Sequence, residues 1–135
     1  MNKTRLLILC TGNSCRSQMA EGFFRAMRND EFEVYSAGIE AHGLNPRAVK
    51  VMKESGIDIS NQTSDTVDKY LNISFDRVIT VCDNVRESCP IFPSATNKIH
   101  KSFPDPVQYN GTEEEIMNEF RRVRDEIREF VESIL

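Results

Sequence analysis

The fold of this chain is decided near its N-terminus by residues 6–17, whose sequence is LLILCTGNSCRS. Residues 6–9 are wholly apolar, as expected of a central parallel strand that is covered on both faces. From residue 17 to residue 29 the apolar residues recur at helical spacing. Residues 10–16 therefore form a tight strand-to-helix loop, which is a place where backbone N–H groups can bind an anion.

The rest of the chain alternates strand and helix patterns. Strands are predicted at residues 33–38, 77–82 and 97–103. Helices are predicted after Asn45-Pro46 up to Gly56, from a Ser64 cap through Tyr70, and from the Thr112/Glu115 capping box to Ile134. Strands that alternate with helices form parallel βαβ units. The sequence thus predicts one α/β domain over residues 1–135, a three-layer α/β/α sandwich with a four-stranded parallel sheet.

Composition and net charge argue against several classes of protein. The chain has 135 residues, of which 39% are hydrophobic and 28% charged, and its formal net charge is -4. This balance argues against a nucleic-acid partner, which needs clustered Lys and Arg. No segment has the apolar length to cross a membrane or to form a signal-peptide core, so we expect a cytoplasmic protein. In a reducing cytosol four cysteines are not a structural disulfide framework. Metal binding, redox catalysis and inert burial remain open for them.

The loop after the first strand has the chemistry of an oxyanion site. Gly12 and Asn13 are residue types that tolerate the positive φ of a backbone nest. Arg16 can clamp two oxygens of a tetrahedral anion with its planar fork. Cys10 would lie at the bottom of the nest, where the same field favours its nucleophilic thiolate, and Ser17 could donate a hydrogen bond to that thiolate. The predicted oxyanion-binding loop comprises Thr11, Gly12, Asn13, Ser14, Cys15 and Arg16.

Burial without function is the alternative for both cysteines of this loop. A free cysteine at a strand end is commonly a small buried hydrophobe. For Cys10 that interpretation explains neither Arg16 nor the glycine-asparagine pair, so we favour a nucleophile. Cys15 lies on the flank of the loop, where the motif does not require its sulfur, and we expect it to pack in the core.

Two further cysteines lie after the third predicted strand. Cys82 ends that strand, and strand C-termini of an open parallel sheet share one rim with the ligand crevice. Cys89 follows seven positions later across a mostly polar segment. Structural zinc sites favour cysteine pairs with two to four intervening residues, whereas Cys82 and Cys89 are separated by six. We expect His42 and His100 to be structural or surface groups.

The 10–17 segment resembles the phosphate-binding loop of low-molecular-weight protein tyrosine phosphatases, and the resemblance covers nearly the whole chain. Those enzymes use an aspartate followed by proline as general acid, and the matching pair here is Asp105-Pro106. An acid above the nucleophile would protonate a leaving oxygen. The alternative for Asp105 is a plain turn residue.

A closer resemblance is to the thioredoxin-coupled arsenate reductases of this phosphatase-like family. It is carried by residues 10–22, 35–40, 43–46 and 58–65 together with the pair Cys82 and Cys89. Phosphatases tend to have proline where Gln18 stands, and they carry aromatic residues where Val107 and Gln108 follow Asp105-Pro106.

The resemblance implies reduction of arsenate to arsenite, hence arsenic detoxification, by a relay through Cys10, Cys82 and Cys89. Phosphate or sulfate would bind as analogues, and thioredoxin would supply the electrons without an organic cofactor. The family also implies a potassium ion near the loop, for which the matching residues are Asn13, Glu21, Ser36 and Asp65. Nothing in the sequence demands more than a monomer.

Two other functions remain open. The first is a tyrosine or small-molecule phosphatase that uses Cys10, Arg16 and Asp105, because arsenate and phosphate are near-isosteres. The second is a non-catalytic anion sensor in which Cys10 only packs. Loss of Cys82 and Cys89 separates the phosphatase from the reductase, since only arsenate reduction needs them.

Overall fold

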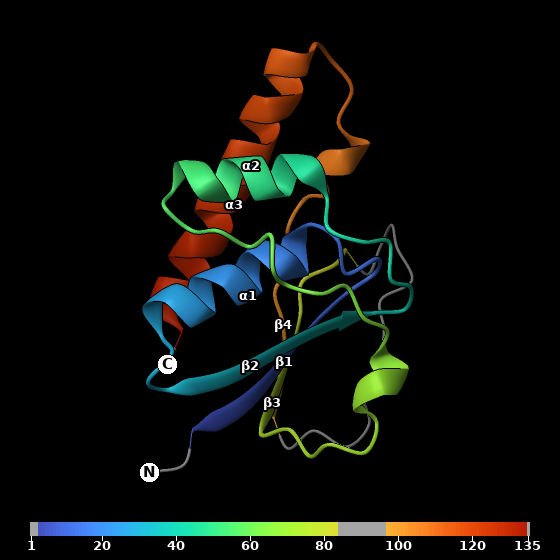
Figure 1. Cartoon of the computed structure of the whole chain (residues 1–135), viewed down its shortest axis with the longest axis vertical. Helices are drawn as coiled ribbons and strands as arrows, with labels where there is room; N and C mark the ends of the chain where they lie inside the picture. The colour runs from blue at the N-terminus through green and yellow to red at the C-terminus, as the bar shows by residue number, and fades with distance from the viewer. Residues whose placement is uncertain (1–2, 84–96, 135) are drawn as a thin grey trace.

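A computed structural model describes residues 3–83 and 97–134 of the chain. Four parallel strands form one sheet in the order β2-β1-β3-β4, and Figure 1 labels each of them. The strands are β1 (Thr4–Cys10), β2 (Phe32–Gly38), β3 (Arg77–Thr80) and β4 (Asn97–His100). The helices are α1 (Arg16–Met27), α2 (Pro46–Glu54) and α3 (Glu113–Ser133), with the short 3-10 turns η1 (Val67–Tyr70) and η2 (Pro106–Gln108).

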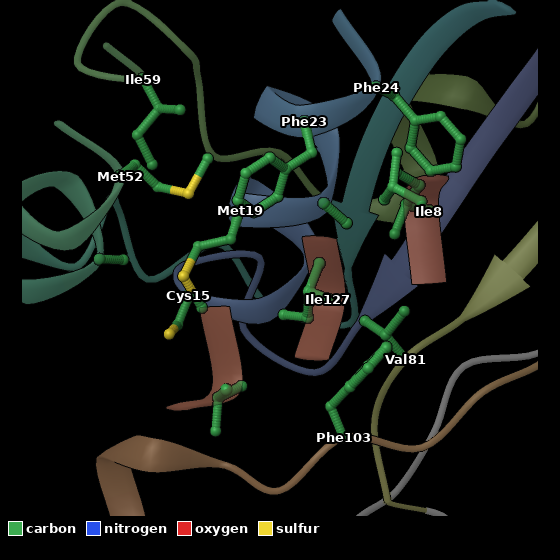
Figure 2. Close-up of a cluster of buried hydrophobic side chains, with 14 of the residues drawn as sticks. Ile8, Cys15, Met19, Phe23, Phe24, Met52, Ile59, Val81, Phe103 and Ile127 are labelled. Carbon is green, nitrogen blue, oxygen red and sulfur yellow. The ribbon is translucent and has the colours of Figure 1, made fainter. Parts of the chain in front are cut away.

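The two faces of β1 are both buried, as its continuous apolar run predicts. Leu6 and Ile8 point into the cluster that the sheet shares with α1, α2 and α3, whereas Leu7 and Leu9 point into a smaller cluster with Tyr70 of η1. Successive side chains of a strand point to opposite faces, so one short run fills two cores. The result is the predicted three-layer α/β/α sandwich, whose larger core is drawn in Figure 2.

Several predicted element ends differ from the structure. The fourth strand ends at His100 and not at residue 103, because Phe103 turns into the helix-side core, where its ring meets Phe130 edge to face. The third strand ends at Thr80, although Val81 N still donates to Leu9 O. Ser64 does not cap the short helix. Thr66 precedes η1, and the Ser64 hydroxyl donates instead to a carbonyl of the 10–16 loop.

The long helix α3 is fixed at both ends. At its start, Thr112 and Glu115 form the predicted capping box. Its last turn has no basic residue, but Arg28, which follows α1, donates from Nη1 to Val131 O at 3.1 Å and also to Ile134 O. A cation at a helix C-terminus satisfies carbonyl groups that lack intrahelical partners.

Replacing Arg28 with alanine should therefore destabilise the fold. We expect the free energy of unfolding to fall by about 1–2 kcal/mol, because the last carbonyls of α3 lose a charged donor. Arg128→Ala is the matched control, since within residues 3–83 and 97–134 Arg128 makes only an exposed ion pair, with Glu132 at 3.6 Å. Its loss should cost less than about 0.5 kcal/mol. Urea denaturation measures both, and equal losses would contradict the capping role.

None of the helices within residues 3–83 and 97–134 combines the length and the apolar character that crossing a membrane requires.

Candidate active site

The loop between β1 and α1 curves around a cleft because a neighbouring segment holds its carbonyl groups from outside. Glu40 N donates to Thr11 O at 3.1 Å, His42 N to Gly12 O at 2.9 Å, and Asn45 N to Ser14 O at 2.9 Å. With their carbonyls tied to residues 40–45, these peptides turn their N–H groups the other way. The loop thereby presents donors at the N-terminus of α1, where the helix dipole also favours an anion.

Asn13 supplies the positive backbone angle that the nest needs, with φ 46°. It is fully buried, and its amide Nδ2 donates to Ser17 Oγ at 2.9 Å and to Ser36 Oγ at 3.0 Å. Its Oδ1 accepts from Asp65 N at 2.7 Å. Asparagine is one of the few non-glycine residues that tolerate a positive φ, and this hydrogen-bonded network holds Asn13 in that conformation.

Gly12 does not adopt the positive φ expected of it, unlike Gly43 and Gly56. A side chain at this position would instead require the exposed ring of His42 to move. A Cβ at Gly12 would lie 2.5 Å from the Nδ1 atom of His42, whose ring covers this part of the loop. His42 lines the cleft and pairs with Glu40. His42 is thus part of the cleft wall. From the sequence it was expected only to be a structural or surface residue.

The cleft has a volume of about 820 Å³ and is lined on its inner side by residues of the loop. Arg16 is almost completely buried, and its Nη1 donates to Phe103 O at 3.3 Å. Its Nη2 lies 3.6 Å from Asp105 Oδ2. The structure thus brings Cys10, Arg16 and Asp105 to one cleft. Other lining residues include Thr11, Gly12, Ser14, Cys15, Asp83 and Tyr109.

Asp105 is held by the turn that follows it. It caps η2, where its Oδ1 accepts from Val107 N at 3.0 Å, while Oδ2 faces the Arg16 guanidinium. The adjoining Pro106 sits in the first turn of η2, where its missing N–H is not needed. A carboxyl group fixed in the same cleft as a cysteine can serve as a general acid. Tyr109, which directly follows the two positions where an aromatic side chain was expected, lines the cleft.

The two cysteines of the loop have different surroundings, although both are free and buried. Cys15 packs with Met19 and the rest of the larger core, as Figure 2 shows. Burial raises the pKa of the Cys15 thiol far above its ordinary value, and the charges of Asp105 and Cys10 raise it further. A raised pKa disfavours the thiolate of Cys15, which is the reactive form of a cysteine.

Cys82 lies just beyond the end of β3, at the same edge of the sheet as Cys10. The hydrogen bond from Val81 N to Leu9 O, 2.9 Å long, aligns these two chain segments. Cys82 is fully buried and is disulfide-bonded. The next residue, Asp83, lines the cleft. Cys89 lies outside the described residues.

The four residues expected to hold a cation are brought together beneath the loop. Asn13 contacts Ser36 and Asp65 as described above, and Ser36 Oγ donates to Glu21 Oε1 at 2.6 Å. Burial raises the pKa of Glu21, although the hydrogen bond from Ser36 and the charge of Arg25 oppose that change. Carboxylate, hydroxyl and amide oxygens are the ligands that hard cations prefer. The oxygen types of this donor set are ones that a potassium ion can use, although the Asp65 carboxylate here pairs with Lys69 Nζ at 3.1 Å and Glu21 Oε2 pairs with Arg25.

Sequence reasoning missed Gln18 and Ser64 as members of the site. Gln18 is fully buried, and its Nε2 donates to Asn13 O at 3.0 Å and to Thr63 O at 2.9 Å. Ser64 Oγ donates to Asn13 O at 2.8 Å. The sequence signal that could have identified Gln18 is its polar side chain on a helix whose neighbouring residues, such as Met19 and Ala20, are apolar core residues.

Comparison with known proteins places this site in a family. The model of the family "Low molecular weight phosphotyrosine protein phosphatase" matches residues 5–135. A protein named arsenate reductase from Halalkalibacterium halodurans is 58% identical over 127 residues, which are 94% of this chain and 91% of the relative. Another protein of that name, from Bacillus subtilis, is 53% identical, with 98% of this chain and 99% of the relative covered.

A solved structure agrees with these sequence matches. It is described as an arsenate reductase in the phosphate binding state, is 33% identical and superposes with a TM-score of 0.81. The match covers 96% of this chain and 94% of the other. The likeness therefore extends over nearly the whole of both chains.

Proposed function

The chain belongs to the low molecular weight phosphotyrosine protein phosphatase family, alongside relatives named arsenate reductase, and we propose that it reduces arsenate to arsenite. In this proposal Cys10, Cys82 and Cys89 form a thiol-disulfide relay that thioredoxin regenerates, and the cell gains arsenic detoxification. The observation that carries it is the cleft in which a free Cys10 lies with Arg16 and Asp105, at the sheet edge that also holds Cys82.

The first step is attack of the Cys10 thiolate on arsenic. Backbone N–H groups of the loop and the Arg16 guanidinium hold the tetrahedral oxyanion and stabilise the charge on its oxygens. An oxygen of arsenate leaves as water, with a proton from Asp105. The product is a Cys10–arsenic adduct in which arsenic is still pentavalent. Phosphate and sulfate have the same shape and charge pattern, so we expect both to compete for this cleft.

The reduction comes from thiol exchange. The Cys82 thiolate attacks the Cys10 sulfur, an S–S bond forms, and the S–As electron pair leaves with arsenic, which departs as trivalent arsenite. Cys89 then attacks Cys82 and releases the Cys10 thiolate. The Cys82–Cys89 disulfide is reduced by the dithiol of thioredoxin through a mixed disulfide. One arsenate thus consumes two electrons, which two thiols supply.

The placement of the cysteines supports this order. Cys10 and Cys82 lie at the same end of the sheet, where the hydrogen bond from Val81 N to Leu9 O aligns their two chain segments. Such a relay works only where a thiol system keeps it reduced, so we propose that the protein acts in the cytoplasm, as a monomer.

A coupled assay tests the proposal. Purified reduced protein is incubated with arsenate, thioredoxin, thioredoxin reductase and NADPH, and the loss of NADPH is followed at saturating arsenate. Consumption that needs both arsenate and thioredoxin supports the relay. Hydrolysis of an aryl phosphate without any arsenate-dependent consumption would instead favour a phosphatase. That second function draws support from the size of the cleft, which exceeds what a tetrahedral anion fills, and from the aromatic Tyr109 in its lining.

We further propose that potassium binds at Asn13, Glu21, Ser36 and Asp65 and steadies the loop from below. Exchange of sodium for saturating potassium should raise the melting temperature by about 3 °C or more, because a ligand that binds only the folded state stabilises it. Glu21→Gln should abolish this difference, since a neutral amide replaces the buried carboxylate. Glu132→Gln is the control, because Glu132 is an exposed residue of α3. Identical melting in both salts would contradict the cation site.

A further inference from the structure

The carbonyl groups of the loop are held by two kinds of partner. Those of Thr11, Gly12 and Ser14 accept from main-chain N–H groups of residues 40–45. The Asn13 carbonyl is the exception among these four, because it accepts from side chains. Ser64 Oγ donates to it at 2.8 Å and Gln18 Nε2 at 3.0 Å.

The direction of the Asn13 carbonyl fixes the direction of the next N–H group. A trans peptide is planar, so the carbonyl of Asn13 and the N–H of Ser14 point to opposite sides of one plane. Ser14 lines the cleft, whereas Ser64 and Gln18 lie outside that lining. The two donors therefore face the Asn13 carbonyl from behind the loop and leave the Ser14 N–H directed into the cleft.

We propose that Gln18 and Ser64 are positioning residues that hold the Ser14 N–H toward a bound tetrahedral oxyanion. The inference deepens the proposed function and depends on its claim that the cleft binds such an anion. Without these donors the Asn13–Ser14 peptide could rotate about ψ of Asn13 and φ of Ser14, because the Asn13 carbonyl would lose the two hydrogen bonds that hold it. Such a rotation would turn a carbonyl oxygen toward the anion in place of a donor.

Both side chains are themselves anchored, so that they can restrain the peptide. Gln18 is fully buried, its Nε2 also donates to Thr63 O, and its Oε1 accepts from Gln62 Nε2 at 2.8 Å. The Ser64 hydroxyl accepts from Gly43 N at 3.1 Å. Residues 62–64 and Gly43 are thus tied to the back of the loop, 25 or more positions away from it in sequence.

Binding of inorganic phosphate to the reduced protein tests the inference. We expect Ser64→Ala to raise the phosphate Kd about fivefold and Gln18→Leu to raise it about tenfold. The arsenate KM should rise in parallel while kcat stays within about twofold of the wild type, because the Ser14 N–H contacts the anion in the ground state and the transition state alike. In NMR spectra the Ser14 amide should lose most of the shift that phosphate induces. Ser64→Thr, which keeps the hydroxyl, should restore the wild-type Kd.

The control variant is Ser133→Ala. Its hydroxyl also donates to a backbone carbonyl, that of Phe130, but at the far end of α3. It should leave the phosphate Kd unchanged. A phosphate Kd that stays at the wild-type value in Ser64→Ala and Gln18→Leu, even with a lowered melting temperature, would overturn the positioning role and leave the proposed function intact. No phosphate binding by the wild-type protein would overturn both. Phosphate binding needs no thiol exchange, so the redox relay does not affect this measurement.

Discussion

Cys10→Ser should reduce arsenate-dependent NADPH consumption to the background, a loss of at least about 10⁴-fold, as is typical when a covalent nucleophile is removed. A serine hydroxyl stays protonated near neutral pH, so it cannot attack arsenic as the Cys10 thiolate does. The loop itself should survive, because Cys10 is buried and serine is of similar size. We therefore expect the phosphate Kd to stay within about threefold of the wild type, as measured by calorimetry.

Cys15→Ala supplies the contrast for this prediction. Burial keeps the pKa of the Cys15 thiol high, so its sulfur takes no part in the chemistry, and we expect the variant to lose less than about tenfold in kcat. The stability should fall by about 1 kcal/mol, because the side chain packs in the core beside Met19. If Cys15→Ala were inactive while Cys10→Ser retained arsenate reduction, the assignment of the nucleophile would be wrong.

The parts of the fold that depend on local patterns could be predicted from the sequence. The apolar run of β1 demanded burial on both faces, and the Thr112/Glu115 pair fixed the start of α3. The end of β4 could not be predicted, because residues 101–103 look like a continuing strand. It is the tertiary contact between Phe103 and Phe130 that turns the chain away from the sheet.

Some residues of the candidate site could likewise be predicted from the sequence, and others could not. Cys10 and Arg16 are recognisable because their spacing in one loop matches a chemical need, and Asp105 because a resemblance points to it. The partners of the Asn13 carbonyl could not be predicted from the sequence, since Ser64 is 51 positions away and its hydroxyl was expected to cap a helix. His42 was out of reach as well. Its place above Gly12 follows from the course of residues 40–45, and no local pattern encodes that course.

The relay itself makes the second large prediction. Cys89→Ser should release at most one arsenite per enzyme and then stop, because no thiol remains to free Cys10 from the Cys10–Cys82 disulfide. Relative to continuous turnover, this is a loss of at least about 10³-fold in steady-state rate. Quenched-flow measurement of arsenite gives the stoichiometry, and mass spectrometry of the alkylated, digested protein identifies the trapped disulfide.

Cys82→Ser separates the relay from the anion chemistry. It should release no arsenite, since the Cys10–arsenic adduct then has no thiol to resolve it. Slow hydrolysis of an aryl phosphate should persist within about threefold of the wild-type rate in Cys82→Ser and in Cys89→Ser, because Cys10, Arg16 and Asp105 are unchanged. Removing the Cys82 thiol thus stops turnover once the Cys10–arsenic adduct has formed. Removing the Cys89 thiol stops it one step later, at the Cys10–Cys82 disulfide. Sustained arsenate reduction by either variant would exclude a relay through all three cysteines. Parallel loss of phosphate-ester hydrolysis would instead mean that the substitutions disturb the cleft.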